Sequence, residues 1–73
     1  MPEMPTAPTF QLNGSSLPWT PEISLATVLA KQGFLPERVA TAINGAFVQR
    51  EARESTWVQP GDQVMTFEAI VGG

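Results

Sequence analysis

Residues 23–36, ISLATVLAKQGFLP, carry the clearest local pattern in the chain and predict one helix. Ser24 can accept hydrogen bonds from the free N–H groups of a first helical turn. Gly33 stands where a left-handed residue usually ends a helix, and Pro36 prevents the helix from resuming. The apolar residues between these ends fall on one helix face: Leu25, Val28 and Leu29. A helix of about nine residues is marginal alone, so it must be stabilised by packing on a sheet.

Two Asn-Gly pairs flank the helix and predict tight hairpins at Asn13-Gly14 and Asn44-Gly45. Both residue types tolerate the positive φ angles that two-residue hairpin turns require. Residues 9–13 alternate apolar and polar side chains, which is the period of a half-buried strand. Pro18 follows the first pair and cannot donate to a strand ladder, so the second strand should be short and lie at a sheet edge. Residues 39–48 should form the second hairpin.

Residues 63–71 predict a final strand that is apolar on both of its faces. One face carries Val64, Thr66 and Ile70, and the other carries Met65, Phe67, Ala69 and Val71. A single short helix can cover only one face of a sheet, so we expect one of these sets to lie exposed. Exposed apolar patches usually mark partner sites. We therefore predict that a docking face is formed by Met65, Phe67, Ala69 and Val71.

The predicted elements run strand, strand, helix, strand, strand, strand along the chain. This order indicates an α+β domain, with one mixed sheet of about five strands packed on one helix. The core should lie between the helix and the covered face of the sheet, and should contain Phe10, Leu12, Val28, Leu29 and Val64.

The segment from residue 49 to residue 58 has no clean period. Its charged residues, Glu51, Arg53 and Glu54, indicate a solvated loop or a short helical turn. Trp57 is assigned to the core, because an indole buries a large area. The acidic residues Asp62 and Glu68 are interpreted as a turn former and a solvated charge rather than as catalytic acids.

Composition excludes several classes of function. The chain has 73 residues, which allows one domain with a thin core, and it has neither Cys nor His. The usual general base, metal ligands and thiol chemistry are therefore missing, so we do not expect an enzyme, a metal or a bound cofactor. The net charge of −3 lacks the basic footprint of a nucleic-acid or membrane binder. The absence of Cys, of a signal peptide and of a long apolar run favours a cytoplasmic protein.

The two ends of the sequence are expected to lie outside the packed domain of residues 9–71. Residues 1–8 include three prolines and predict a disordered, dispensable extension. Gly72 and Gly73 form a flexible tail at the other end. Because glycine lacks a Cβ, this tail can lie extended in a narrow slot and present the α-carboxylate of Gly73 to another protein. The alternative interpretation is a frayed terminus without function.

The order of these motifs resembles the ThiS-type sulfur carriers among the ubiquitin-like β-grasp proteins. The resemblance covers about residues 9–73 and rests on Leu12-Asn13-Gly14, Ser24-Leu25 with Val28-Leu29, Ala42-Ile43-Asn44-Gly45 leading to Val48 and Arg50, Gly61-Asp62-Gln63-Val64, and Gly72-Gly73. MoaD-like carriers share the fold and the tail, but Arg50 followed by Trp57 is closer to ThiS. The proline-rich residues 1–8, the spacing from Arg50 to Trp57, and Pro18-Trp19 depart from the family pattern.

The resemblance implies a mechanism in which partners perform the catalysis. A ThiF/MoeB-like enzyme, using ATP and Mg²⁺, would adenylate the Gly73 carboxylate. Sulfur from a cysteine desulfurase or another persulfide donor would then displace AMP and leave a thiocarboxylate. A ThiG-like thiazole synthase would take this sulfur for thiamine.

Three other functions stay open at this point. A MoaD-like carrier would serve molybdopterin or another thio-biosynthetic pathway, and a ubiquitin-like modifier would use the same tail to tag lysines. A plain interaction domain would use the sheet face and ignore the tail.

Overall fold

The computed structural model describes residues 7–68 of the chain. Its secondary structure follows the predicted order, with two short 3-10 helices, η1 and η2, added in the connections. The elements are β1 (Thr9–Leu12), β2 (Ser15–Pro18), α1 (Leu25–Lys31), η1 (Pro36–Arg38), β3 (Val39–Ile43), β4 (Ala46–Val48), η2 (Arg50–Ser55) and β5 (Gln63–Glu68).

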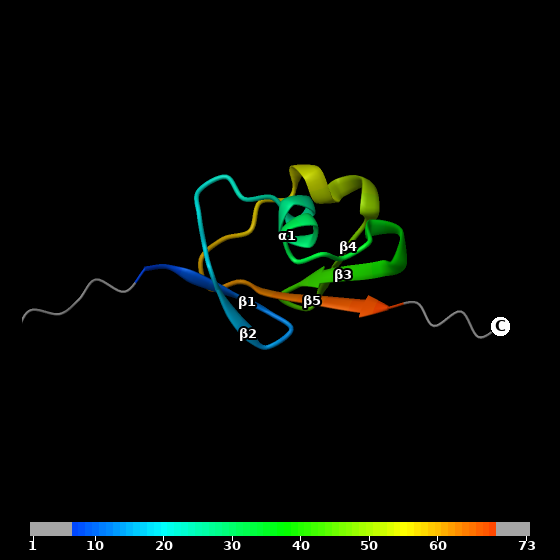
Figure 1. Cartoon of the computed structure of the whole chain (residues 1–73). Coiled ribbons are helices and arrows are strands. Elements are labelled where there is room, and N and C mark those ends of the chain that lie inside the picture. The colour runs from blue at the N-terminus through cyan, green and yellow to red at the C-terminus, as the bar shows by residue number, and fades with distance from the viewer. Residues whose placement is uncertain (1–6, 69–73) are drawn as a thin grey trace, which may run out of the picture.

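The strands form one five-stranded mixed sheet in the order β2-β1-β5-β3-β4. β5 lies at the centre, parallel to β1 and antiparallel to β3. The helix α1 packs on one side of this sheet (Figure 1). The predicted α+β class is therefore confirmed, and β2, which ends at Pro18, is short and lies at a sheet edge as expected.

The caps of α1 are those that the sequence predicts. The Oγ of Ser24 accepts a hydrogen bond from the N–H of Thr27 at 3.1 Å. Gly33 has a φ of +81°, and the following N–H of Phe34 donates to the carbonyl of Leu29 at 2.9 Å. The helix has seven residues, two fewer than the expected nine or so, because its last hydrogen-bonded turn closes at the cap residue Gln32.

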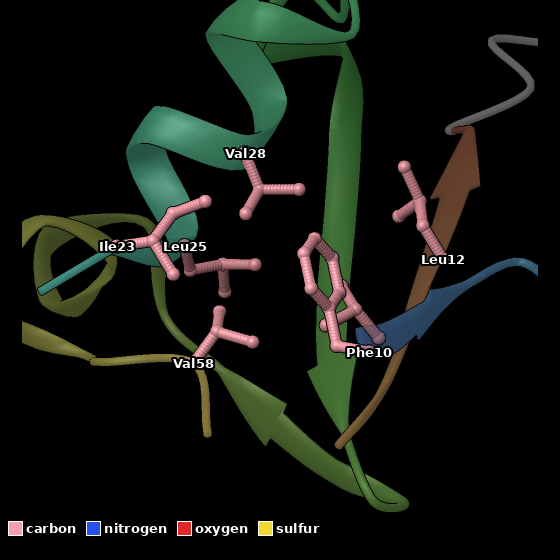
Figure 2. Close-up of a cluster of buried hydrophobic side chains, with 7 residues drawn as sticks. Phe10, Leu12, Ile23, Leu25, Val28 and Val58 are labelled. Atoms are coloured by element: carbon pink, nitrogen blue, oxygen red, sulfur yellow. The ribbon is translucent and has the colours of Figure 1, made fainter. Parts of the chain in front are cut away.

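The core lies between α1 and the covered face of the sheet. Figure 2 shows side chains of α1 and its flanking loops meeting those of β1. The buried apolar residues of this core are Phe10, Leu12, Ile23, Leu25, Val28, Leu29, Val39, Val58 and Val64; Ala42 is also buried, but on the opposite face of the sheet. This set includes Phe10, Leu12, Val28, Leu29 and Val64, which the sequence predicts for the core, but not Trp57.

Trp57 corrects one prediction, because 52% of its surface is exposed. It forms an isolated antiparallel bridge with Ser24, so the backbone is extended there and successive side chains point to opposite sides. Val58 takes the inward position and is only 1% exposed. The other tryptophan, Trp19, is half-buried, and its Nε1 donates to the carbonyl of Val58 at 2.6 Å.

Arg53 corrects a second prediction. The short helical turn of η2 is present, but Arg53 is 4% exposed rather than solvated. Its guanidinium donates to the carbonyl of Val39 at 2.6 Å, to the carbonyl of Pro36 at 2.9 Å and to the hydroxyl of Thr41 at 3.2 Å. Burial, followed by repulsion from Arg50, lowers the pKa of Arg53, and Glu51 opposes that change. Arg53 therefore ties η2 to β3 and η1.

Candidate docking face and carboxyl-terminal segment

β5 separates the two faces of the sheet residue by residue. Val64 points toward α1 and is 1% exposed, whereas Met65 and Phe67 point away from it and are 45% and 51% exposed. The expected assignment of these three residues to the two faces is therefore correct. Whether Met65 and Phe67 contact a partner stays a prediction.

Strand pairing extends the apolar surface across three strands. Ala42 of β3 lies directly opposite Phe47 of β4 and Met65 of β5, so all three side chains share one face. Ala40 lies opposite Phe67 in the same way. Phe47 is 68% exposed. We call this surface the open face; it comprises Ala40, Ala42, Phe47, Met65 and Phe67.

Sequence reasoning placed Phe47 in a hairpin without assigning it to a face. Its alternation within Ala46-Phe47-Val48 is too short to reveal which side is buried. The observed register settles the matter, because Phe47 shares its face with Met65.

The open face is uncharged in the part that the structure describes. Its neighbours on β1 and at the start of β5, Gln11 and Gln63, lie opposite each other in the sheet and are polar but neutral. A shallow hollow borders Met65 here, and it is lined by Gln11, Asn13, Gly14, Gln63, Val64 and Met65. An apolar, uncharged surface of this kind loses little on desolvation when a partner covers it.

Asn13 fixes β5 from the β1 side. Its turn has the positive φ angles expected of an Asn-Gly hairpin, +51° at Asn13 and +88° at Gly14. In addition, its Oδ1 accepts from the N–H of Thr66 at 2.9 Å and its Nδ2 donates to the Thr66 hydroxyl at 2.8 Å. The side chain therefore continues the β1–β5 ladder after the backbone has turned away.

Asn44 fixes the same strand from the β3 side. Its Oδ1 accepts from the N–H of Gln63 at 2.9 Å, and its own N–H donates to the carbonyl of Gln63 at 2.8 Å. Its Nδ2 donates to Oδ1 of Asp62 at 2.9 Å. The sequence identified both asparagines as turn residues only; their side-chain contacts span 53 and 19 positions and leave no local pattern.

Asp62 has the turn role that the sequence predicts. Its Oδ2 accepts a hydrogen bond from the N–H of Gln59 at 2.8 Å, across the Pro60-Gly61 turn. Its Oδ1 accepts one from Nδ2 of Asn44. Glu68 is exposed at the end of β5. Within residues 7–68 no group of three or more His, Cys, Asp or Glu side chains gathers in a way that could hold a metal ion.

Several predicted site residues lie outside the described residues. They are Ala69 and Val71 of the expected docking face and Gly72 and Gly73 of the expected tail. The described part ends at Glu68, five positions before Gly73. Five residues can span at most about 18 Å when extended, which limits how far Gly73 can lie from the end of β5.

No helix in the described part of the chain is long and apolar enough to cross a bilayer.

The sheet order, the single covering helix and the open face define a ubiquitin-like β-grasp domain. The chain belongs to the ThiS family, whose model matches residues 7–73. Among solved structures it is similar to the thiamine biosynthesis protein ThiS from Geobacter metallireducens, with 26% sequence identity and a TM-score of 0.75. That similarity covers 89% of this chain and 99% of the other. The comparison with curated protein sequences finds no match.

Proposed function

We propose that the protein is a sulfur carrier of thiamine biosynthesis, and that the Gly73 carboxylate is the group that carries the sulfur. The observation that supports this most is the ThiS family match, which runs from residue 7 through the final Gly72-Gly73. The similarity to the Geobacter metallireducens ThiS protein over nearly the whole of both chains supports the same function.

The proposed chemistry uses the tail as a substrate for other enzymes. A carboxylate is a poor acyl donor, so a ThiF/MoeB-like enzyme first joins it to AMP, with ATP and Mg²⁺ bound by that enzyme. The terminal sulfur of a cysteine persulfide, supplied by a cysteine desulfurase or a similar donor, then attacks the acyl carbon and AMP leaves. A second thiol cleaves the resulting S–S bond, which releases the thiocarboxylate and leaves a disulfide. The resulting thiocarboxylate has a more nucleophilic sulfur than the carboxylate oxygen it replaces, and a ThiG-like thiazole synthase accepts that sulfur.

The described structure supplies two features that suit this role. Asn13 and Asn44 hold β5 from both sides, which orients the strand that leads to the tail. The open face presents Phe47, Met65 and Phe67 without charge beside that strand. We propose that the adenylating enzyme docks on this face, with Ala69 and Val71 extending it, while the tail enters the enzyme's active site.

Intact-mass spectrometry of the protein isolated from its own cells tests the proposal. We expect a fraction of molecules whose mass shows one oxygen replaced by sulfur, with the change located at Gly73 by fragmentation. A variant that lacks Gly73 is the control and should show no such fraction.

Two other results would redirect the function. Ladders of larger proteins that carry this chain on lysine would indicate a ubiquitin-like modifier. A thiocarboxylate whose sulfur is accepted in another pathway, such as molybdopterin synthesis, and not by thiazole synthase would indicate a MoaD-like carrier.

A further inference from the structure

The two Asn-Gly pairs favour tight turns, and they are also chemically reactive. In an Asn-Gly pair the glycine nitrogen can attack the Asn side-chain carbonyl carbon, because glycine has no Cβ to obstruct the approach. The new C–N bond closes a succinimide ring, and the side-chain nitrogen leaves as ammonia. Water then opens the ring at one of its two carbonyl carbons: attack at the former side-chain carbon gives aspartate, and attack at the main-chain carbon gives isoaspartate. Asn13 and Asn44 are both exposed, so water reaches either site.

At Asn44 the structure shows what the new carboxylate would face. The N–H of Gln63 can only donate a hydrogen bond, so the side-chain atom of Asn44 that accepts it, at 2.9 Å, must be the oxygen Oδ1. The side-chain nitrogen therefore points to Oδ1 of Asp62, at 2.9 Å. Replacing this nitrogen by a carboxylate oxygen removes the hydrogen-bond donor and places the new carboxylate of residue 44 next to the carboxylate of Asp62. The hydrogen bond between the β3–β4 turn and Asp62, just before β5, is replaced by repulsion, whereas the N–H of Gln63 still finds an acceptor oxygen at position 44.

At Asn13 the same reasoning gives the opposite result. The N–H of Thr66 fixes the Asn13 oxygen, and the nitrogen faces the Thr66 hydroxyl at 2.8 Å. A hydroxyl can accept from an amide or rotate and donate to a carboxylate. Conversion of Asn13 to aspartate therefore keeps both hydrogen bonds to β5.

We propose that Asn44-Gly45 is a deamidation site whose conversion to aspartate turns the hydrogen bond with Asp62 into a repulsion and so loosens the β3–β4 turn against the residue that precedes β5, whereas conversion of Asn13 keeps both of its side-chain contacts with β5. This asymmetry concerns the free protein and does not depend on the carrier function. It makes Asn44 the turn residue at which conversion to aspartate weakens the packing at the entry to β5.

Encoded aspartates test the proposal by denaturant unfolding of the full chain. Asn44→Asp should lower the folded-to-unfolded equilibrium constant about three- to tenfold, as expected for an exposed hydrogen bond lost and a like-charge pair gained. The matched control, Asn13→Asp, should change it by less than about twofold. Equal effects of the two variants would overturn the proposal.

A charge exchange sharpens the test. In Asn44→Asp with Asp62→Asn, the new amide at position 62 can donate to the new carboxylate at position 44 and still accept from the N–H of Gln59. This double variant should recover most of the stability lost in Asn44→Asp, and failure to recover it would show that the Asp62 contact is not the cause.

Ageing of the wild-type protein at mildly alkaline pH completes the test. After brief proteolysis, peptide mapping should find deamidation at Asn44 enriched in the cleaved fraction and aspartate at position 13 retained in the intact fraction. An unmodified Asn44 after prolonged incubation would overturn its assignment as a modification site.

Discussion

The two faces of the sheet are similar in composition and opposite in environment. Phe10, Leu12 and Val64 on the covered face are at most 6% exposed, whereas Met65 and Phe67 on the open face are about half exposed. The difference arises from α1, whose seven residues cover one side only. Apolar area that α1 covers stabilises the fold, while apolar area on the other side remains available to a partner. Substitutions on the two faces should therefore separate stability from binding.

The largest effect on stability is expected in the core. Leu29 is 1% exposed, so Leu29→Ala should lower the free energy of unfolding by roughly 2–5 kcal/mol, through lost burial and a cavity. Leu35, which is 55% exposed, provides a matched control for the same chemical change. Denaturant melts of both variants measure the difference, and a cost at Leu35 as large as at Leu29 would contradict the assignment of the covered face.

A somewhat smaller effect is expected at Arg53. Arg53→Met leaves the carbonyls of Pro36 and Val39 without their donors, which should cost about 2–4 kcal/mol of unfolding free energy. Arg53→Lys keeps the positive charge, but a single ammonium group cannot reach all three acceptors that the guanidinium reaches. Its cost in unfolding free energy should therefore be intermediate. Thermal melts of the three proteins check this order. A neutral Arg53→Met would show that the buried guanidinium is dispensable.

The sequence predicted those features of the fold that are determined by residues close together in the chain. The Ser24 cap, the Gly33 stop and the two Asn-Gly turns are local features, and each is present as predicted. Alternation also sorted Val64 from Met65 and Phe67, because a strand has a period of two.

Arg53 and Trp57 could not be placed in this way. Both lie in a segment of 3-10 turn and extended chain that has no period to read. Arg53 is buried because acceptors from β3 and η1 converge on it, and those elements are 12 to 17 positions away. The side-chain contacts of Asn13 and Asn44 with β5 were missed for the same reason.

The open face should give a small change in stability and a large change in binding. Phe67→Ala should alter the free energy of unfolding by less than about 1 kcal/mol and weaken binding to the ThiF/MoeB-like enzyme by more than about 1 kcal/mol. Trp57→Ala is the matched control, because Trp57 is 52% exposed against 51% for Phe67 but lies beside the start of α1. Titration calorimetry with the enzyme compares them. Equal losses of affinity would mean that docking does not use the open face.

The smallest effect on stability and the largest on function are expected at Gly73. Gly73 has no side chain to bury, so its deletion should leave the melting temperature unchanged. The terminal carboxylate would, however, be displaced by about 3.3–3.6 Å, and a misplacement of even ~1 Å can cost about 10²-fold in rate. The decisive measurement is ATP–pyrophosphate exchange by the cognate adenylating enzyme, with the wild-type protein and the Gly73 deletion side by side. Loss of exchange in a fully folded deletion variant is the predicted result, and exchange at the wild-type rate would contradict the carrier function.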